Sequence, residues 1–148
     1  MTWRTIRSLG WTVMAGLLVG VMLAPAPAAG QGDERVRVFN APKDRVWTVA
    51  RSTLKGLGWD IDKEDHEVGW IRTDSRRLEG DDFGVYAKGT KQRLRVVVKS
   101  LDAGRTAVTV ERRVWRQERI LWMDKEEDLP TADRKVELQV LDAIGGAL

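Results

Sequence analysis

The chain has 148 residues, no cysteine, and 25 Lys and Arg residues against 22 Asp and Glu residues. This length fits one domain of ordinary size, and without cysteine no disulfide can stabilise it. Arg4 and Arg7 are the only charged residues of the first thirty, and the remaining 23 basic and 22 acidic residues nearly balance. The net positive charge therefore does not indicate a nucleic-acid partner.

Residues 1–30 have the order of a secretory signal peptide. Two arginines come first, an uncharged run over 9–24 follows, and small residues close the stretch with Ala26-Pro27-Ala28. We expect cleavage near 28–30 and a folded domain over 31–148, with 31–34 as a polar linker. An uncleaved N-terminal anchor is the alternative, although the run is shorter than the roughly 20 residues of a spanning helix. Either way we expect an exported protein, in the periplasm or at the periplasmic face of the outer membrane.

The first half of the domain predicts a strand, a helix and a hairpin. Residues 35–40 alternate valine with arginine, as in a strand with one buried face. Residues 42–56 carry apolar side chains at helical spacing, and Pro42 suits a first helical turn. The stretch 59–74 reads as two short strands around the turn "DHEVG". Ile71 and Thr73 share one face of the second strand, and Trp70 and Arg72 share the other.

The second half predicts a strand pair and a helix. Residues 75–90 show no sustained period and suggest a long loop, with a short edge strand near 84–87. The stretches 91–100 and 106–117 alternate around the turn "LDAGR", and Arg112 interrupts the pattern, which predicts a bulge or a partly open end there. Residues 118–130 read as a connection. The last helix should begin at Thr131 as N-cap and stop at Gly145. Helices on one face of an antiparallel sheet define the α+β class.

The only histidine of the chain, His66, lies in the predicted hairpin around 58–74. Acidic residues surround it there, namely Asp60, Asp62, Glu64, Asp65 and Glu67, and they raise the question of a metal or catalytic site. A calcium loop starting at Asp60 would need glycine where Asp65 stands and glutamate where Ile71 stands. A zinc site needs three or four histidine or cysteine ligands, and the chain has one histidine. We therefore expect no catalytic residue, no metal and no cofactor, and we keep a hydrolase built on His66 as the least favoured hypothesis.

The tryptophans suggest a contact surface instead. Trp47 and Trp59 lie on or beside the helix stripe and should be core residues. The other three tryptophans of the domain fall off the inward phase of their strands, and exposed aromatic side chains are typical of interfaces. A basic patch accompanies them in "VERRVWRQER". The predicted partner-binding surface consists of Trp70, Trp115, Trp122, Arg113 and Arg116.

Two long stretches, "NAPKDRVWTVARSTLKGLGWDIDKEDHEVGWIRTD" and "KQRLRVVVKSLDAGRTAVTVERR", resemble the repeated domain of BamC-type lipoproteins. These proteins are accessory subunits of the machinery that assembles β-barrels in the bacterial outer membrane. The resemblance covers about residues 36–116 and the final helix. It implies a helix-grip fold, an antiparallel sheet of 4–6 strands gripping one long helix in the order β-α-β-β-β-β-α, and it carries no catalytic residues.

Together these observations predict a non-enzymatic, exported accessory binding module of the cell envelope. Its partner would be an envelope protein, such as a subunit of the outer-membrane assembly machinery, with lipid or membrane-surface contact as a further expectation. With one such domain and no cysteine to lipidate, it would be a soluble single-domain relative. The alternative is a periplasmic carrier of a lipid or other apolar ligand, held between helix and sheet.

Overall fold

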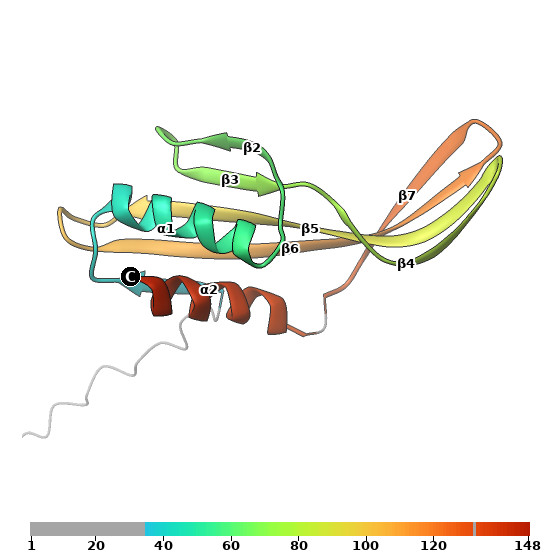
Figure 1. Ribbon diagram of the computed structural model, residues 1–148. Helices are drawn as coiled ribbons and strands as arrows, with labels where there is room; N and C mark the ends of the chain where they lie inside the picture. The colour runs from blue at the N-terminus through green and yellow to red at the C-terminus, as the bar shows by residue number, and fades with distance from the viewer. Residues whose placement is uncertain (1–34, 132) are drawn as a thin grey trace, which may run out of the picture. The chain divides into compact units, whose positions relative to one another are not determined.

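The computed structural model describes residues 35–131 and 133–148. The expected signal peptide and linker, residues 1–34, lie outside the described residues. The elements follow in the order β1 (Val36–Phe39), α1 (Lys43–Gly56), β2 (Ile61–Asp65), β3 (Trp70–Thr73), β4 (Arg76–Phe83), β5 (Tyr86–Ser100), β6 (Thr106–Ile120), β7 (Met123–Leu129) and α2 (Lys135–Ala147) (Figure 1). Neither described helix has the length and apolar character needed to cross a membrane.

The expected helix-grip fold is wrong. The described residues form one antiparallel sheet of seven strands, in the order β1-β6-β5-β3-β2, with β4 added to β5 and β7 added to β6. The two helices are short, with 14 and 13 residues, and they contact each other and the sheet (Figure 1). No long helix within these residues is wrapped by the sheet. The prediction failed because strand pairing takes up two stretches that it assigned to loops.

The core between the helices and the sheet follows the expected apolar pattern. Helix α1, predicted over 42–56, is confirmed, and its buried stripe includes Val46, Ala50 and Leu54. Trp47 and Trp59 are core residues, as predicted. The core side chains of the sheet come from β1, β3, β5 and β6, namely Phe39, Ile71, Leu94, Val96, Val98, Val108 and Val110.

Helix α2 begins and ends later than predicted. Its N-cap residue is Arg134 and not Thr131, and the helix continues through Gly145 to Ala147. Val140 and Ile144 on its buried face belong to the core. Gly145 lies against the ring of Phe39, where a Cβ atom would come within 3.2 Å of it. The glycine therefore allows close packing and does not stop the helix.

The hairpin of β5 and β6 runs unbroken for 15 residues on each strand. The predicted strand pair around "LDAGR" is confirmed, with Val96 opposite Val110 and Val98 opposite Val108. The predicted bulge at Arg112 is wrong, because the register continues past it without a shift. Arg112 keeps its place on the helix-facing side by pairing with Glu137 of α2, Nε to Oε2 at 3.4 Å.

Beyond the part of the sheet that the helices cover, β5 and β6 continue with new neighbours. Strand β4 pairs with β5 from Arg76–Gln92 to Phe83–Tyr86, and β7 pairs with β6 from Val114–Leu129 to Ile120–Met123. The loop predicted over 75–90 and the connection predicted over 118–130 are therefore wrong. We call this four-stranded region, β4-β5-β6-β7, the extension (Figure 1).

Candidate functional site

The structure separates the five residues of the predicted partner-binding surface. Trp70, half-buried on β3, and Arg113 of β6 line one hollow in the sheet. Trp115 is only 4% exposed, and the guanidinium groups of Arg93 and Arg113 lie over its ring, 5.5 and 4.9 Å from the ring centre. These contacts bury a tryptophan that the sequence pattern placed at the surface.

The other two residues lie elsewhere. Arg116 follows Trp115 on β6 and so points to the opposite face, where its guanidinium is 3.9 Å from the carboxylate of Glu127. Trp122 lies in the turn between β6 and β7 and is 87% exposed. The five residues therefore do not form one surface, and two separate features remain.

The first feature is the end of the extension. Two two-residue turns, Gly84–Val85 and Leu121–Trp122, lie at this end, and the first residue of each has a φ of 58°. Phe83, Tyr86, Ile120 and Met123 are direct cross-strand partners in one row behind the turns, so they share a face. We define the apolar tip as the exposed apolar side chains here, namely Phe83, Val85, Tyr86, Ile120, Leu121, Trp122 and Met123.

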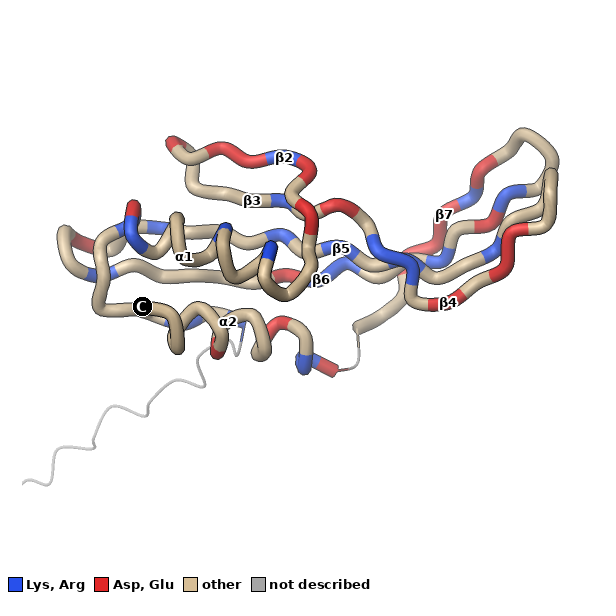
Figure 2. Tube along the Cα trace, in the orientation of Figure 1, with Lys and Arg blue, Asp and Glu red and all other residues tan. Residues whose placement is uncertain are grey.

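No charge interrupts the apolar tip. Figure 2 shows the far end of the extension without Lys, Arg, Asp or Glu, whereas the strands behind it alternate between both signs. Those charges pair with one another, as Arg119 does with Asp124 at 2.7 Å and Lys88 does with Glu118 at 3.5 Å. We call the charged part of the extension behind the apolar tip the stem. The stem thus contains ion pairs, whereas the end of the extension is uncharged.

Sequence reasoning found only Trp122 of this tip. The runs "FGVY" and "ILWM" were visible as apolar stretches between charged ones. The segments that flank these runs, β4 and β7, were not predicted as strands, because they consist mostly of charged and polar residues. With β4 and β7 as strands, both runs become hairpin ends.

The second feature is a hollow of about 490 Å³ on the sheet face opposite the helices. It lies where the neighbour of β5 changes from β3 to β4, so that Arg93 and Leu94 have no register partner on that side. We call it the arginine hollow. It is lined by Trp70, Arg72, Arg93, Arg95, Glu111 and Arg113, and Arg112 adds to the lining.

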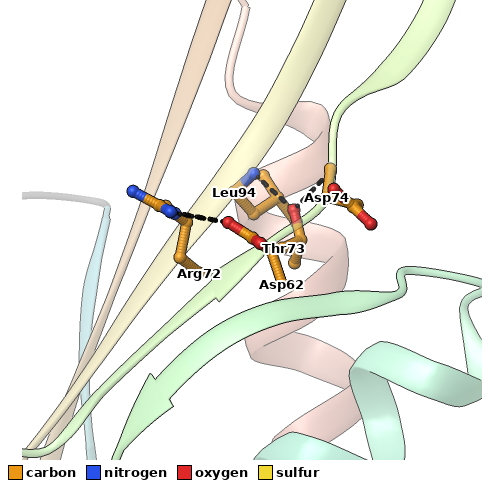
Figure 3. Close-up of polar contacts among 5 residues, drawn as sticks. All are labelled: Asp62, Arg72, Thr73, Asp74 and Leu94. Carbon is orange, nitrogen blue, oxygen red and sulfur yellow. Dashed lines mark hydrogen bonds and ion pairs between the residues drawn. The ribbon is translucent and has the colours of Figure 1, made fainter.

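Side chains from β3 hold this junction together (Figure 3). The Thr73 hydroxyl accepts a hydrogen bond from the Leu94 backbone N–H at 2.9 Å and donates one to the Asp74 carbonyl at 3.0 Å. It thereby supplies the acceptor that β5 lacks once β3 has turned away. Arg72 donates two hydrogen bonds to Asp62 of β2, at 2.6 and 3.0 Å, which fixes its guanidinium at the rim of the hollow.

The His66 side chain contacts helix α1. It is 52% exposed, its Nε2 lies 3.0 Å from Asp44 Oδ1, and its ring meets Trp47 edge-on. The neighbouring Asp65 carboxylate accepts the Val68 backbone N–H at 3.0 Å, so it closes the turn and does not orient the imidazole. Among the described residues no group of three or more His, Cys, Asp or Glu could hold a metal ion.

The perturbed titrating groups belong to exposed ion pairs. A hydrogen bond from Arg119 holds the pKa of Asp124 below its ordinary value, and the same contact raises the pKa of Arg119. A hydrogen bond from Arg105 likewise lowers the pKa of Asp102 in the β5–β6 turn. These pairs stabilise turns at opposite ends of the long hairpin, and neither belongs to the arginine hollow.

No protein-family model matches the chain, and no curated protein matches it either. The resemblance to BamC-type lipoproteins stays a prediction from the sequence. The apolar tip and the arginine hollow are therefore the two features from which we infer function.

Proposed function

We propose that this protein is a non-enzymatic, exported binding module of the cell envelope that engages a protein partner through its apolar tip. The observation that carries the proposal is the set of seven exposed apolar side chains at two adjacent turns. Exposed apolar patches of this kind are typical of interaction sites, since burying them in a partner removes them from water. Trp122 is the natural anchor, because tryptophan dominates interface energetics.

The stem supports this use of the tip. Strands β4 and β7 form the open edges of the extension, and their exposed acids and bases disfavour edge-to-edge pairing with other chains. The charges also pair within the extension, so they add little attraction of their own. Contact with a partner is thereby confined to the uncharged end.

The packed core favours a binding module over a carrier of an apolar ligand. Leu54, Val96 and Ile144, from α1, β5 and α2, are fully buried in one continuous cluster. A carrier would need this space for its ligand. Subunits of the outer-membrane assembly machinery are the partners to examine first, because the sequence stretches quoted above resemble their accessory lipoproteins.

The test is capture of named partners by tagged protein from detergent-solubilised envelopes, read by native mass spectrometry. We expect wild type to retain outer-membrane assembly subunits and Trp122→Ala with Met123→Ala to lose them, because the variant removes the anchor. Leu101→Ala is the matched control: this exposed leucine lies in the turn at the other end of the β5–β6 hairpin. Equal capture by wild type and the folded double variant would refute the proposal.

A further inference from the structure

The arginine hollow contains two like-charged pairs that are unfavourable by themselves. Arg72 of β3 lies directly opposite Arg95 of β5, and Arg93 of β5 lies directly opposite Arg113 of β6. Direct partners in an antiparallel sheet have Cβ atoms roughly 4.5–5.5 Å apart, and like charges in that position are destabilising. Four arginines of the hollow therefore face one another across the ladders at a cost to the fold.

The outer two arginines are neutralised within the protein. Arg72 pairs with Asp62 at 2.6 Å, and Arg113 pairs with Asp128 at 2.7 Å and Glu126 at 3.6 Å. These acids come from β2 and β7, on either side of the hollow. The fold thus supplies carboxylates to the rim of the hollow.

The inner two arginines receive none. Over residues 35–131 and 133–148, neither Arg93 nor Arg95 has a carboxylate within 4 Å, although Glu111 is the cross-strand partner of Arg95. Both stand on β5 two residues apart, so they share a face and both line the hollow. Neither guanidinium group forms an ion pair within these residues, and Glu111 is the one carboxylate that lines the hollow.

The surroundings suit an anionic ligand. The Arg93 guanidinium lies over the Trp115 ring, with its Cζ 5.5 Å from the ring centre, a cation–π contact. The volume of about 490 Å³ is in the range of small-ligand sites, and Trp70 adds a flat apolar wall. Guanidinium groups match the oxygens of phosphate in a bidentate geometry, and one phosphate group has enough oxygens to accept from two arginines.

We propose that the arginine hollow binds a phosphate group through Arg93 and Arg95. The group would replace the counter-charge that the fold withholds from these two side chains, and so relieve both like-charged pairs. Free phosphate compounds and phospholipid headgroups share this chemistry. The site is distinct from the apolar tip and does not depend on the proposed protein partner.

The first measurement is a titration of the full chain with inorganic pyrophosphate, followed by calorimetry and by tryptophan fluorescence, since Trp70 and Trp115 adjoin the site. A parallel arm uses vesicles of phosphatidylcholine with and without phosphatidylglycerol. Saturable pyrophosphate binding supports the proposal with a soluble ligand. Binding to phosphatidylglycerol vesicles alone supports it with a lipid headgroup, provided that Arg95→Gln abolishes it. Absence of binding in both arms overturns it.

Matched variants then separate the site from general charge. Arg95 is exposed, so Arg95→Gln should fold normally and weaken binding about tenfold, the loss expected for one charge-assisted contact. Lys99→Gln removes the same charge from the same face of β5, outside the hollow, and should leave affinity unchanged. Equal weakening by both variants, or vesicle binding lost only in Trp122→Ala, would overturn the proposal.

Discussion

The pair of Arg112 and Glu137 joins the sheet to the start of α2 and allows a stability prediction with a clear asymmetry. The Arg112 side chain is 8% exposed and that of Glu137 is 4% exposed, with Nε and Oε2 3.4 Å apart. Neither of these two atoms has a hydrogen bond, so the attraction between their charges is what joins them. Arg112 has further partners, since its Nη2 donates to the Asp133 carbonyl at 2.7 Å and lies 3.2 Å from that carboxylate.

These contacts set unequal costs for the two single substitutions. Arg112→Met removes the paired charge from the buried Glu137 carboxylate, and breaking a buried ion pair in this way costs about 3–5 kcal/mol. The position of Glu137 in the first turn of α2 offsets about 0.3–1 kcal/mol of this through the helix dipole. Glu137→Gln leaves Arg112 with both Asp133 contacts, so we expect a loss of about 1–2 kcal/mol.

The assay is urea unfolding followed by circular dichroism, with the double variant Arg112→Met/Glu137→Met to close the cycle. Apolar replacement of both partners of a buried ion pair is often neutral, so the double variant should be more stable than Arg112→Met alone. Single substitutions of equal and small effect, or a double variant that loses the sum of both, would refute this reasoning.

Three further predictions concern the core, one turn and one ion pair. Leu54→Ala removes a fully buried side chain of α1 and should lower the free energy of unfolding by about 2–5 kcal/mol in urea titrations. Gly69→Ala should detach β3 from β5, because Gly69 has a φ of +86° and a Cβ atom there would lie 2.3 Å from the Val98 carbonyl oxygen. The Val98 N–H donates a hydrogen bond to the Gly69 carbonyl, so its amide hydrogen should exchange faster in the variant. Unchanged exchange at Val98 would contradict the prediction. The lowered pKa of Asp124 means that its pair with Arg119 contributes to stability at neutral pH and loses that contribution as pH falls through the folded-state pKa. In an NMR titration Arg119→Gln should raise this pKa back toward its ordinary value.

Local patterns in the sequence determined the helix-covered part of the protein. Helix α1, strand β3 and the inner half of the β5–β6 pair were all predictable, because one face of each is buried and the apolar period records it. The same patterns placed Trp47 and Trp59 in the core. Burial against a shared core leaves a trace in the sequence of every element that takes part.

Only the tertiary structure decided the extension and the two sites. Strands β4 and β7 have mostly exposed, charged residues, so their strand character comes from the free edges of β5 and β6 and not from their own period. Register along these edges brings Phe83 and Met123, forty residues apart, into one row at the tip. It also places Arg93 and Arg95 between neutralised arginines of other strands, a grouping set by cross-strand pairing, which no local sequence pattern contains.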